Sequence, residues 1–300
     1  MAGMRYVITC IVGSLIMGGA VPARAQTPAK LPVIATFSIL ADFARNIGGE
    51  RIEVGALVGP DGDTHVYQSK PADARKLGAA RLILVNGLGL EGWIDRLITA
   101  SGAEAPVVVA TQGINPQKMR EEGRIGLDPH AWQSIANAKI YVANIRDGLI
   151  AADPEGAAAY RANADTYLGK LDALDAEVKS EIAKIPPGRR QIITTHDAFG
   201  YFGTAYGFRF IAPEGISTET EASARDVAKI IRQIKAQKIP AVFLENVTDP
   251  RLVRRIAAES GATVGGTLYS DALSPPDGPA STYIDMMRNN VTELSAALAK

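Results

Sequence analysis

The stretch "DPEGAAAYRANADTYLGKLDALDAEVKSEIAKIPP", residues 153–187, decides the fold. Its apolar residues recur at steps of three and four and mark one stripe of a helix. The stripe consists of Tyr160, Ala164, Tyr167, Leu171, Leu174, Val178 and Ile182. Asp153 is a candidate N-cap, Pro154 fits the first helical position, and Pro186 and Pro187 end the pattern. The spacing predicts one helix of about thirty residues and about 45 Å, longer than an ordinary domain helix.

Short runs rich in Val and Ile alternate with helical patterns on both sides of this helix. Strands are predicted at 31–37, 51–58, 81–89 and 105–111 before it, and at 190–196, 208–213, 241–246 and 262–269 after it. A last helix is expected from about Ser281. This alternation is typical of parallel sheets built from βαβ units. The predicted fold class is α/β, with an N-terminal lobe (26–152), a linking helix (153–186) and a C-terminal lobe (187–300).

Residues 1–25 have the pattern of a secretory signal peptide. Arg5 precedes the uncharged apolar run "VITCIVGSLIMGGAV", and Ala23-Arg24-Ala25 forms a small-x-small cleavage site. The run is too short for a stable membrane span, although an uncleaved anchor is the alternative. Cleavage is expected near Ala25–Gln26, which leaves an exported, soluble chain in the periplasm.

Removal of this segment also fixes the charge and the cysteine content of the mature chain. The 32 basic residues lose Arg5 and Arg24, so 30 remain against 32 acidic ones. No basic stripe indicates nucleic-acid binding, and no nucleic-acid partner is expected. Cys10, which is the only cysteine and makes a poor lipid-attachment site, is also lost. Without disulfides, the stability of the mature chain must come from its core.

The three histidines of the chain indicate its chemistry. His65, His130 and His196 each follow a predicted strand, and none lies within an apolar helical face. In open α/β sheets, ligands bind beyond the carboxyl ends of the strands. A single histidine in such a place is often a surface or hydrogen-bonded residue. Neutral imidazole is nevertheless the commonest metal ligand, and three imidazoles facing one interlobe cleft predict a metal site.

The residues leave several candidates for a fourth ligand. Asp271 is the first choice because it follows the last predicted strand directly. Glu245 and Asp197 compete with it, and water is a further possibility. Asp197 also fits the N-cap of the next helix. Glu245 also fits an acceptor for the N–H of a metal-bound imidazole, which such ligands usually need.

Several motifs together resemble a known family. They are "DTHVYQSKPAD", "LDPHAW", "THDAFGYFGTAYGF", "STETEASARDV", "VFLEN" and "GGTLYSDALS…GPASTYIDMM". From about Pro32 to the C-terminus, the chain is similar to the substrate-binding proteins of bacterial zinc and manganese ABC transporters (cluster A-I). The resemblance implies two α/β lobes joined by one rigid helix, with metal in the interlobe cleft. It also implies His65, His130, His196 and Asp271 as ligands, and an inner-membrane permease as partner.

The ligand set favours zinc as the cargo. Three imidazoles and one carboxylate suit tetrahedral Zn²⁺, whereas Mn²⁺ prefers more oxygen donors. Many manganese-handling members have a glutamate at the position of His196, which also favours zinc. Many zinc-handling members carry a histidine-rich loop where residues 112–127 contain no histidine, which weakens that inference. Mn²⁺ is therefore the alternative cargo.

Other classes of protein fit less well. An exported zinc hydrolase would need an open coordination position and a general base, and the chain has neither an HExxH nor a GxSxG motif. An adhesin would be expected to carry repeats or a low-complexity stalk. The sequence therefore predicts a periplasmic substrate-binding protein, not an enzyme, that delivers one Zn²⁺ to its permease. It is expected to be a monomer, and a periplasmic metallochaperone is a further candidate partner.

Overall fold

The computed structural model describes Met1 and residues 29–121, 124–219 and 222–299. The predicted signal peptide, with its cleavage point near Ala25, lies outside the described residues except for Met1. Within these described ranges, no helix combines the length and the apolar character that crossing a membrane requires.

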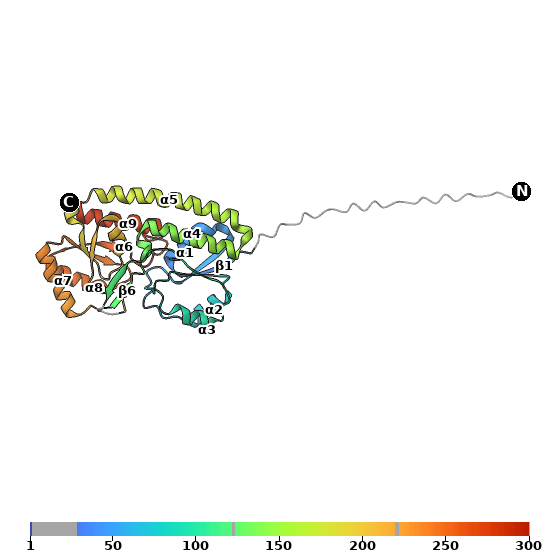
Figure 1. Ribbon diagram of the computed structural model, residues 1–300, viewed down its shortest axis with the longest axis horizontal. Coiled ribbons are helices and arrows are strands. Elements are labelled where there is room, and N and C mark those ends of the chain that lie inside the picture. The colour runs from blue at the N-terminus through green and yellow to red at the C-terminus, as the bar shows by residue number, and fades with distance from the viewer. Residues whose placement is uncertain (2–28, 122–123, 220–221, 300) are drawn as a thin grey trace.

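The N-terminal lobe contains a four-stranded parallel sheet with the strand order β2-β1-β3-β4 (Figure 1). Its strands are β1 (Leu31–Phe37), β2 (Ile52–Val58), β3 (Leu82–Val85) and β4 (Val107–Val109). Its helices are α1 (Ser38–Gly48), α2 (Pro71–Ala79), α3 (Ile94–Ser101) and α4 (Ile135–Ala152). All four strands lie within the ranges predicted from the sequence. The central strands are the most buried, as expected for a parallel sheet covered by helices.

The C-terminal lobe repeats this architecture with the strand order β10-β9-β7-β8. Its strands are β7 (Gln191–Ile193), β8 (Arg209–Ile211), β9 (Ala241–Glu245) and β10 (Thr263–Leu268). Its helices are α6 (Gly200–Tyr206), α7 (Ala224–Gln237), α8 (Pro250–Ser260) and α9 (Tyr283–Leu298). All its strand pairs are parallel, so the predicted α/β class with two parallel-sheet lobes is confirmed.

The predicted loop 112–127 contains an antiparallel hairpin that the sequence did not indicate. Its strands are β5 (Lys118–Glu121) and β6 (Arg124–Leu127). The hairpin lacks the apolar alternation that reveals a half-buried strand, and Ile125 is 69% exposed. The segment leading into it reaches the other lobe, because the backbone N–H of Gln117 donates to the hydroxyl of Tyr201 at 3.0 Å.

The long helix α5 (Ala157–Ala183) runs along both lobes (Figure 1). Its 27 residues correspond to about 40 Å. The predicted apolar stripe is its buried face, which packs against α1, α4 and α9. Helices α1 and α4 belong to the N-terminal lobe, and α9 belongs to the C-terminal lobe. Helix α5 therefore connects the two lobes along its length. Four short 3₁₀ segments complete the described elements: Gly49–Arg51, Ala131–Gln133, Pro154–Gly156 and Pro187–Arg189.

The start of this helix differs from the expectation. A 3₁₀ turn precedes α5, and the side chain of Asp153 makes no capping hydrogen bond. Its carboxylate instead accepts hydrogen bonds from the Arg51 guanidinium at 2.9 and 3.0 Å and from the Tyr160 hydroxyl at 2.6 Å. Since Arg51 belongs to the N-terminal lobe, these charge-assisted bonds join the start of the helix to that lobe.

One continuous hydrophobic core extends across both lobes. It includes Phe43 of α1 and Leu171 of α5, and it continues to Phe243 of β9 and Leu268 of β10. A second, smaller cluster lies under α7 and α8. Because the larger core is shared, separating the lobes would expose apolar surface that α5 now covers.

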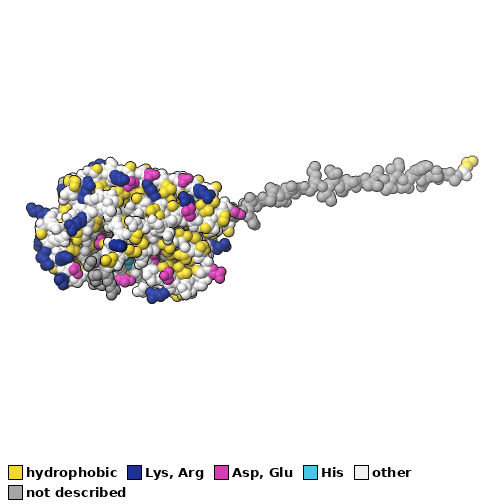
Figure 2. Space-filling model, in the orientation of Figure 1, with side chains coloured by type: hydrophobic (Ala, Val, Ile, Leu, Met, Phe, Trp, Pro, Cys, Tyr) yellow, Lys and Arg dark blue, Asp and Glu magenta, His cyan; other side chains and the backbone are white. Residues whose placement is uncertain are grey.

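The surface carries charges of both signs, with one local excess. Lysine and arginine side chains gather at the end of the C-terminal lobe, where α7 lies (Figure 2). Arg225, Lys229 and Arg232 are exposed and are spaced along one side of this helix. The composition, with equal numbers of basic and acidic residues, did not reveal this basic helix face.

Truncation of the buried stripe of α5 should destabilise the whole protein. Leu171 is fully buried in the shared core, so Leu171→Ala should lower the free energy of unfolding by about 2–5 kcal/mol. The measurement is urea unfolding followed by circular dichroism. The neighbouring exposed Lys170→Ala should change stability by less than about 0.5 kcal/mol. Equal effects of the two substitutions would contradict the shared core.

A buried carboxyl group between α1 and α9 should make stability depend on pH. Burial raises the pKa of Asp42 to about 6, although its carboxylate accepts a hydrogen bond from the backbone N–H of Tyr283. The folded state therefore holds the proton more tightly than the unfolded state, whose pKa is about 3.9. This contribution is fully present below about pH 4 and is lost as pH rises through about 6.

Asp42→Asn should remove that pH dependence. As pH rises from 4 to 7, the variant should gain stability relative to the wild type by up to about 3 kcal/mol. Urea unfolding at several pH values measures this difference. Asp165→Asn, on the exposed side of α5, is the matched control and should follow the wild type. A constant difference between Asp42→Asn and the wild type across this range would disprove the assignment.

Candidate metal centre

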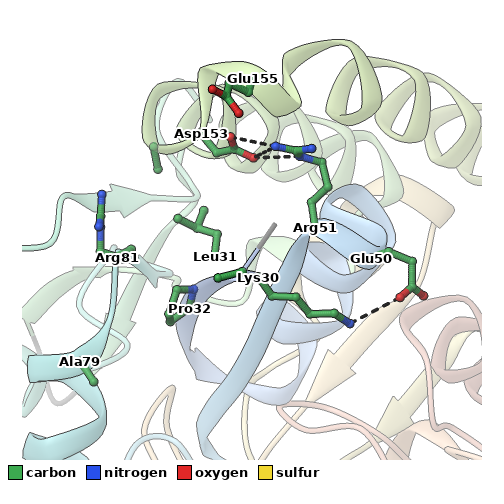
Figure 3. Close-up of a pocket in the computed structure, with 11 residues that line it drawn as sticks. Lys30, Leu31, Pro32, Glu50, Arg51, Ala79, Arg81, Asp153 and Glu155 are labelled. Carbon is green, nitrogen blue, oxygen red and sulfur yellow. Dashed lines mark hydrogen bonds and ion pairs between the residues drawn. The ribbon is translucent and has the colours of Figure 1, made fainter. Parts of the chain in front are cut away.

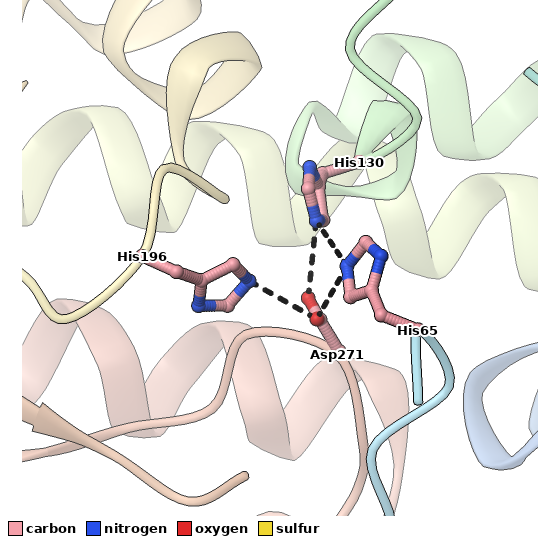
Figure 4. Close-up of side chains that lie close together, drawn as sticks. All are labelled: His65, His130, His196 and Asp271. Carbon is pink, nitrogen blue, oxygen red and sulfur yellow. Dashed lines mark hydrogen bonds and ion pairs between the residues drawn. The ribbon is translucent and has the colours of Figure 1, made fainter. Parts of the chain in front are cut away.

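Four side chains from four separate loops meet between the lobes (Figure 4). His65 lies between β2 and α2, and His130 follows the hairpin strand β6. His196 follows β7, and Asp271 follows β10. Each lobe thus contributes two of the four residues that the sequence analysis selected.

The distances between their polar atoms fit a small divalent cation. The Nε2 atom of His65 lies 3.1 Å from Nε2 of His130 and 3.3 Å from Oδ2 of Asp271. Oδ2 also lies 3.1 Å from Nε2 of His196, while Oδ1 lies 3.6 Å from Nε2 of His130. A tetrahedral zinc ion with bonds of about 2.0–2.1 Å separates its donor atoms by about 3.3 Å. One donor atom of each residue lies within 4.8 Å of all the others.

The cluster is almost completely buried. His130, His196 and Asp271 have no exposed surface, and His65 is 8% exposed. Burial without a partner is costly for a charged carboxylate, and Oδ1 of Asp271 has no hydrogen-bond partner among the described residues. A cation at the centre of the cluster would satisfy this oxygen. The arrangement therefore has the donor chemistry and the unsatisfied charge of a metal site.

A carboxylate behind His130 orients its ring. Oδ1 of Asp128 lies 2.8 Å from Nδ1 of His130 and also accepts a hydrogen bond from the backbone N–H of His130 at 2.9 Å. Nδ1 therefore carries the proton, and the lone pair of Nε2 points to the centre. This role of Asp128 was not predicted from the sequence. The signal was present, because Asp-Pro-His brings the carboxylate back to a histidine two residues later.

Glu245 occupies the corresponding place behind His196. Its Oε2 lies 2.6 Å from Nδ1 of His196, in ion-pair contact but without hydrogen-bond alignment. Its Oε1 accepts from the backbone N–H groups of Thr195 at 2.7 Å and His196 at 2.9 Å. Glu245 therefore faces the back of the imidazole and not the centre of the cluster.

Asp197 does not have the role expected for it. Helix α6 begins at Gly200 with Phe199 before it, so Asp197 is not its N-cap. Burial raises the pKa of Asp197 to about 6, and the nearby charge of Asp128 adds to this effect. Two residues, Ala198 and Phe199, lie between Asp197 and the first helical residue, so its side chain is not placed as the expected cap.

The carboxylates make the cluster attractive to positive charge. Burial alone lowers the pKa of His196, but the charges of Glu245 and Asp271 outweigh it and raise this pKa well above its usual value. Burial raises the pKa of Asp271, but the charges of His196 and His130 hold it well below its usual range. The carboxylate of Asp271 therefore stays ionised despite its burial.

Hydrogen bonds across the lobes hold the two halves of the cluster together. The indole N–H of Trp132 donates to the carbonyl of Ser270 at 2.8 Å, and the side-chain amide of Gln133 donates to the same carbonyl at 2.7 Å. The hydroxyl of Tyr283 donates to the carbonyl of Trp132 at 2.7 Å. The ring of Trp132 is fully buried between His130 and Phe37. It therefore packs beside the cluster as part of the core.

The cavities described at the other end of the N-terminal lobe have a different character. One, of about 660 Å³, lies at the start of β1 and contains no histidine (Figure 3). Four of its charged side chains form two ion pairs, Arg51 with Asp153 and Lys30 with Glu50. In open α/β folds ligands bind at the carboxyl ends of strands, and this cavity lies at the amino end of β1. We therefore place the functional site at the histidines.

Comparisons with known proteins identify the relatives of this chain. Residues 33–297 match the family described as "Zinc-uptake complex component A periplasmic". The chain is 37% identical over 271 residues to the iron-binding protein YfeA of Yersinia pestis, covering 90% of this chain and 87% of that protein.

Two solved structures are similar over most of their length. The manganese-bound periplasmic metal binding protein of Candidatus Liberibacter asiaticus has a TM-score of 0.80 and 35% identity, covering 89% of this chain and 99% of the other. The periplasmic zinc binding protein TroA of Treponema pallidum has a TM-score of 0.86 and 32% identity, covering 91% and 100%. These relatives are named for three different metals.

Proposed function

Since the chain belongs to the family of periplasmic zinc-uptake complex components, we propose that it binds one Zn²⁺ ion and delivers it to a permease. It is a metal-binding protein of an ABC importer and not an enzyme. The proposed ligands are Nε2 of His65, His130 and His196 together with the carboxylate of Asp271. The ion is the cargo of the protein.

One observation carries the proposal: three imidazole nitrogens and one carboxylate converge from both lobes at a buried point. Carboxylates behind His130 and His196 support it further, because metal-bound histidines usually pass their other N–H to such a group. Four protein donors leave no open position for a reactive water, which is the arrangement of a site that holds a metal rather than uses it.

The donor chemistry favours zinc over manganese. Three nitrogen donors and one carboxylate are a common set for Zn²⁺, and nitrogen-rich sites bind zinc more tightly than manganese or ferrous iron.

Mn²⁺ or Fe²⁺ is the second candidate, and one feature of Asp271 favours it. Both carboxylate oxygens face histidine nitrogens, Oδ2 towards His65 and His196 and Oδ1 towards His130. Bidentate binding would give five donors, which suits a metal that prefers more oxygen ligands. Relatives named for iron and for manganese support this alternative.

We also propose how the protein is exported and how it acts. A signal peptide ending near Ala25 directs it to the periplasm, where it acts as a monomer with lobes 26–152 and 187–300 joined by the helix 153–186. It meets the inner-membrane permease there, and a periplasmic metallochaperone is a candidate donor of the metal. Because α5 and the shared core restrain the lobes, the loop 59–65 is the proposed moving part during release.

Metal content of the purified chain tests the proposal. Protein purified from the periplasm without chelator should contain one zinc per chain by elemental mass spectrometry, and excess Mn²⁺ or Fe²⁺ should not displace it. If the protein instead contains one manganese or iron per chain that excess Zn²⁺ does not displace, the carrier role stands and its cargo is that metal. A chain that contains no metal and takes none up on titration would refute the proposed function.

Loss of a ligand should weaken binding strongly. His196→Ala and Asp271→Asn should each reduce the zinc affinity by more than about 100-fold. Mutation of the residues that hydrogen-bond to metal ligands already lowers metal affinity by about 10- to 100-fold, and loss of a ligand itself should cost more. Competition with a chromophoric chelator measures the affinity. The matched control is Asp277→Asn, an identical change at an exposed aspartate six residues away. Unchanged affinity in both ligand variants would remove these residues from the site.

A further inference from the structure

The loop between β3 and α3, residues 86–93 with the sequence "NGLGLEGW", contacts both histidine-bearing loops of the N-terminal lobe. We propose that this loop is a positioning element that fixes His65 and His130 relative to each other. The inference rests on the proposed function, because it concerns the same metal site. None of its residues belongs to the proposed ligand set.

The first residue of the loop holds the backbone beside His130. The amide Nδ2 of Asn86 donates to the carbonyl of Pro129 at 3.0 Å. Its Oδ1 accepts from the hydroxyl of Tyr141 at 2.6 Å, which fixes the orientation of the amide. Asn86 and Tyr141 have no exposed surface, so loss of this contact would leave a buried carbonyl without its partner.

The last residue of the loop holds the backbone beside His65. The indole N–H of Trp93 donates to the carbonyl of Thr64 at 2.9 Å, and its ring packs against Tyr67 at 5.0 Å. This support matters because His65 differs from the other two histidines. The structure gives His130 and His196 a carboxylate at Nδ1, and within the described part of the chain no such contact is found for His65.

The middle of the loop is tied to the sheet. The carboxylate of Glu91 accepts hydrogen bonds from Thr36 Oγ1 at 2.6 Å, from the N–H of Asn86 at 2.6 Å and from the N–H of Gly87 at 3.2 Å. Thr36 belongs to the central strand β1. Glu91 is buried, so water does not compete for these hydrogen bonds. Through them, the loop is connected to strand β1.

The backbone of the loop has an unusual conformation, which is strained at Leu88. Gly87, Leu88 and Gly89 have φ values of 84°, 56° and 87°. Such values are rare for a leucine and persist where the surroundings determine the conformation. A side chain at Gly87 would lie 2.6 Å from Val109, so this position also requires glycine. Because the loop is held in one conformation, the distance between Asn86 and Trp93 is fixed.

Two substitutions remove the contacts at the two ends of the loop. Trp93→Phe keeps an aromatic ring beside Tyr67, deletes the N–H that holds Thr64 and makes the buried ring smaller. Asn86→Ala deletes the donor that holds Pro129 and, with it, the acceptor of the Tyr141 hydroxyl. The matched control is Asn163→Ala, because Asn163 of α5 also donates to a backbone carbonyl, that of Ile47 at 2.9 Å, but does so away from the metal site.

The readouts are zinc affinity by chelator competition, the visible absorption of bound Co²⁺, and the melting temperature of the metal-free protein. Trp93→Phe and Asn86→Ala should each weaken zinc binding by about 10- to 100-fold. Each should also change the intensity of the Co²⁺ absorption, which reports ligand geometry. Asn163→Ala should leave affinity and spectrum unchanged, whatever it does to the melting temperature.

The outcomes separate this inference from the function on which it rests. If the wild type binds one Co²⁺ and both variants keep its affinity and spectrum, the positioning role is wrong and the carrier role stands. A lower melting temperature alone would mean that the loop only supports the fold, which also overturns the inference. A wild type that binds neither Zn²⁺ nor Co²⁺ would overturn both. If Asn86→Ala does not fold, the conservative Trp93→Phe decides alone.

Discussion

The carbonyl of Ser270 accepts two hydrogen bonds from the opposite lobe, one from Trp132 and one from Gln133. These donors follow His130 by two and three residues, and Ser270 directly precedes Asp271. Residues of the two lobes that lie far apart in the chain are thus held within contact of each other. Both donor side chains are fully buried, so breaking the pair would leave polar groups without water or partner. The rest of the cluster depends on this connection.

Three carboxylates surround the histidines, two behind the rings and one in front of them. Asp128 and Glu245 lie behind the rings of His130 and His196, while Asp271 faces their other nitrogens. Asp128 directs the Nε2 lone pair of His130 inward, Glu245 places negative charge behind His196, and Asp271 supplies negative charge at the centre. A divalent cation is the partner that such an arrangement favours, because it neutralises buried charge and completes four donors at once.

The architecture restricts how such a site could open. Helix α5 and the core that it covers connect the lobes over about 40 Å, so wide separation would expose much apolar surface. The loop that carries His65 is held by smaller contacts, among them Asp63 with Thr218 at 2.6 Å and Asp61 with Asn246 at 3.0 Å. Movement at this rim would break only such contacts and leave the shared core covered, and His65 is the one of the three histidines with exposed surface.

The sequence by itself determined the local structure and the chemistry. Apolar periodicity located the long helix and the strands of both sheets, because burial of one face or of a whole strand leaves a regular pattern. The three histidines stood out because each follows a predicted strand. Only the tertiary structure distinguished the roles of the carboxylates: Asp271 faces the imidazoles and Glu245 lies behind one of them. The contacts of Trp132 and of the loop 86–93 were likewise invisible, because they join residues separated by tens to more than a hundred positions. No local pattern encodes such pairs, since they arise only when packing brings distant loops together.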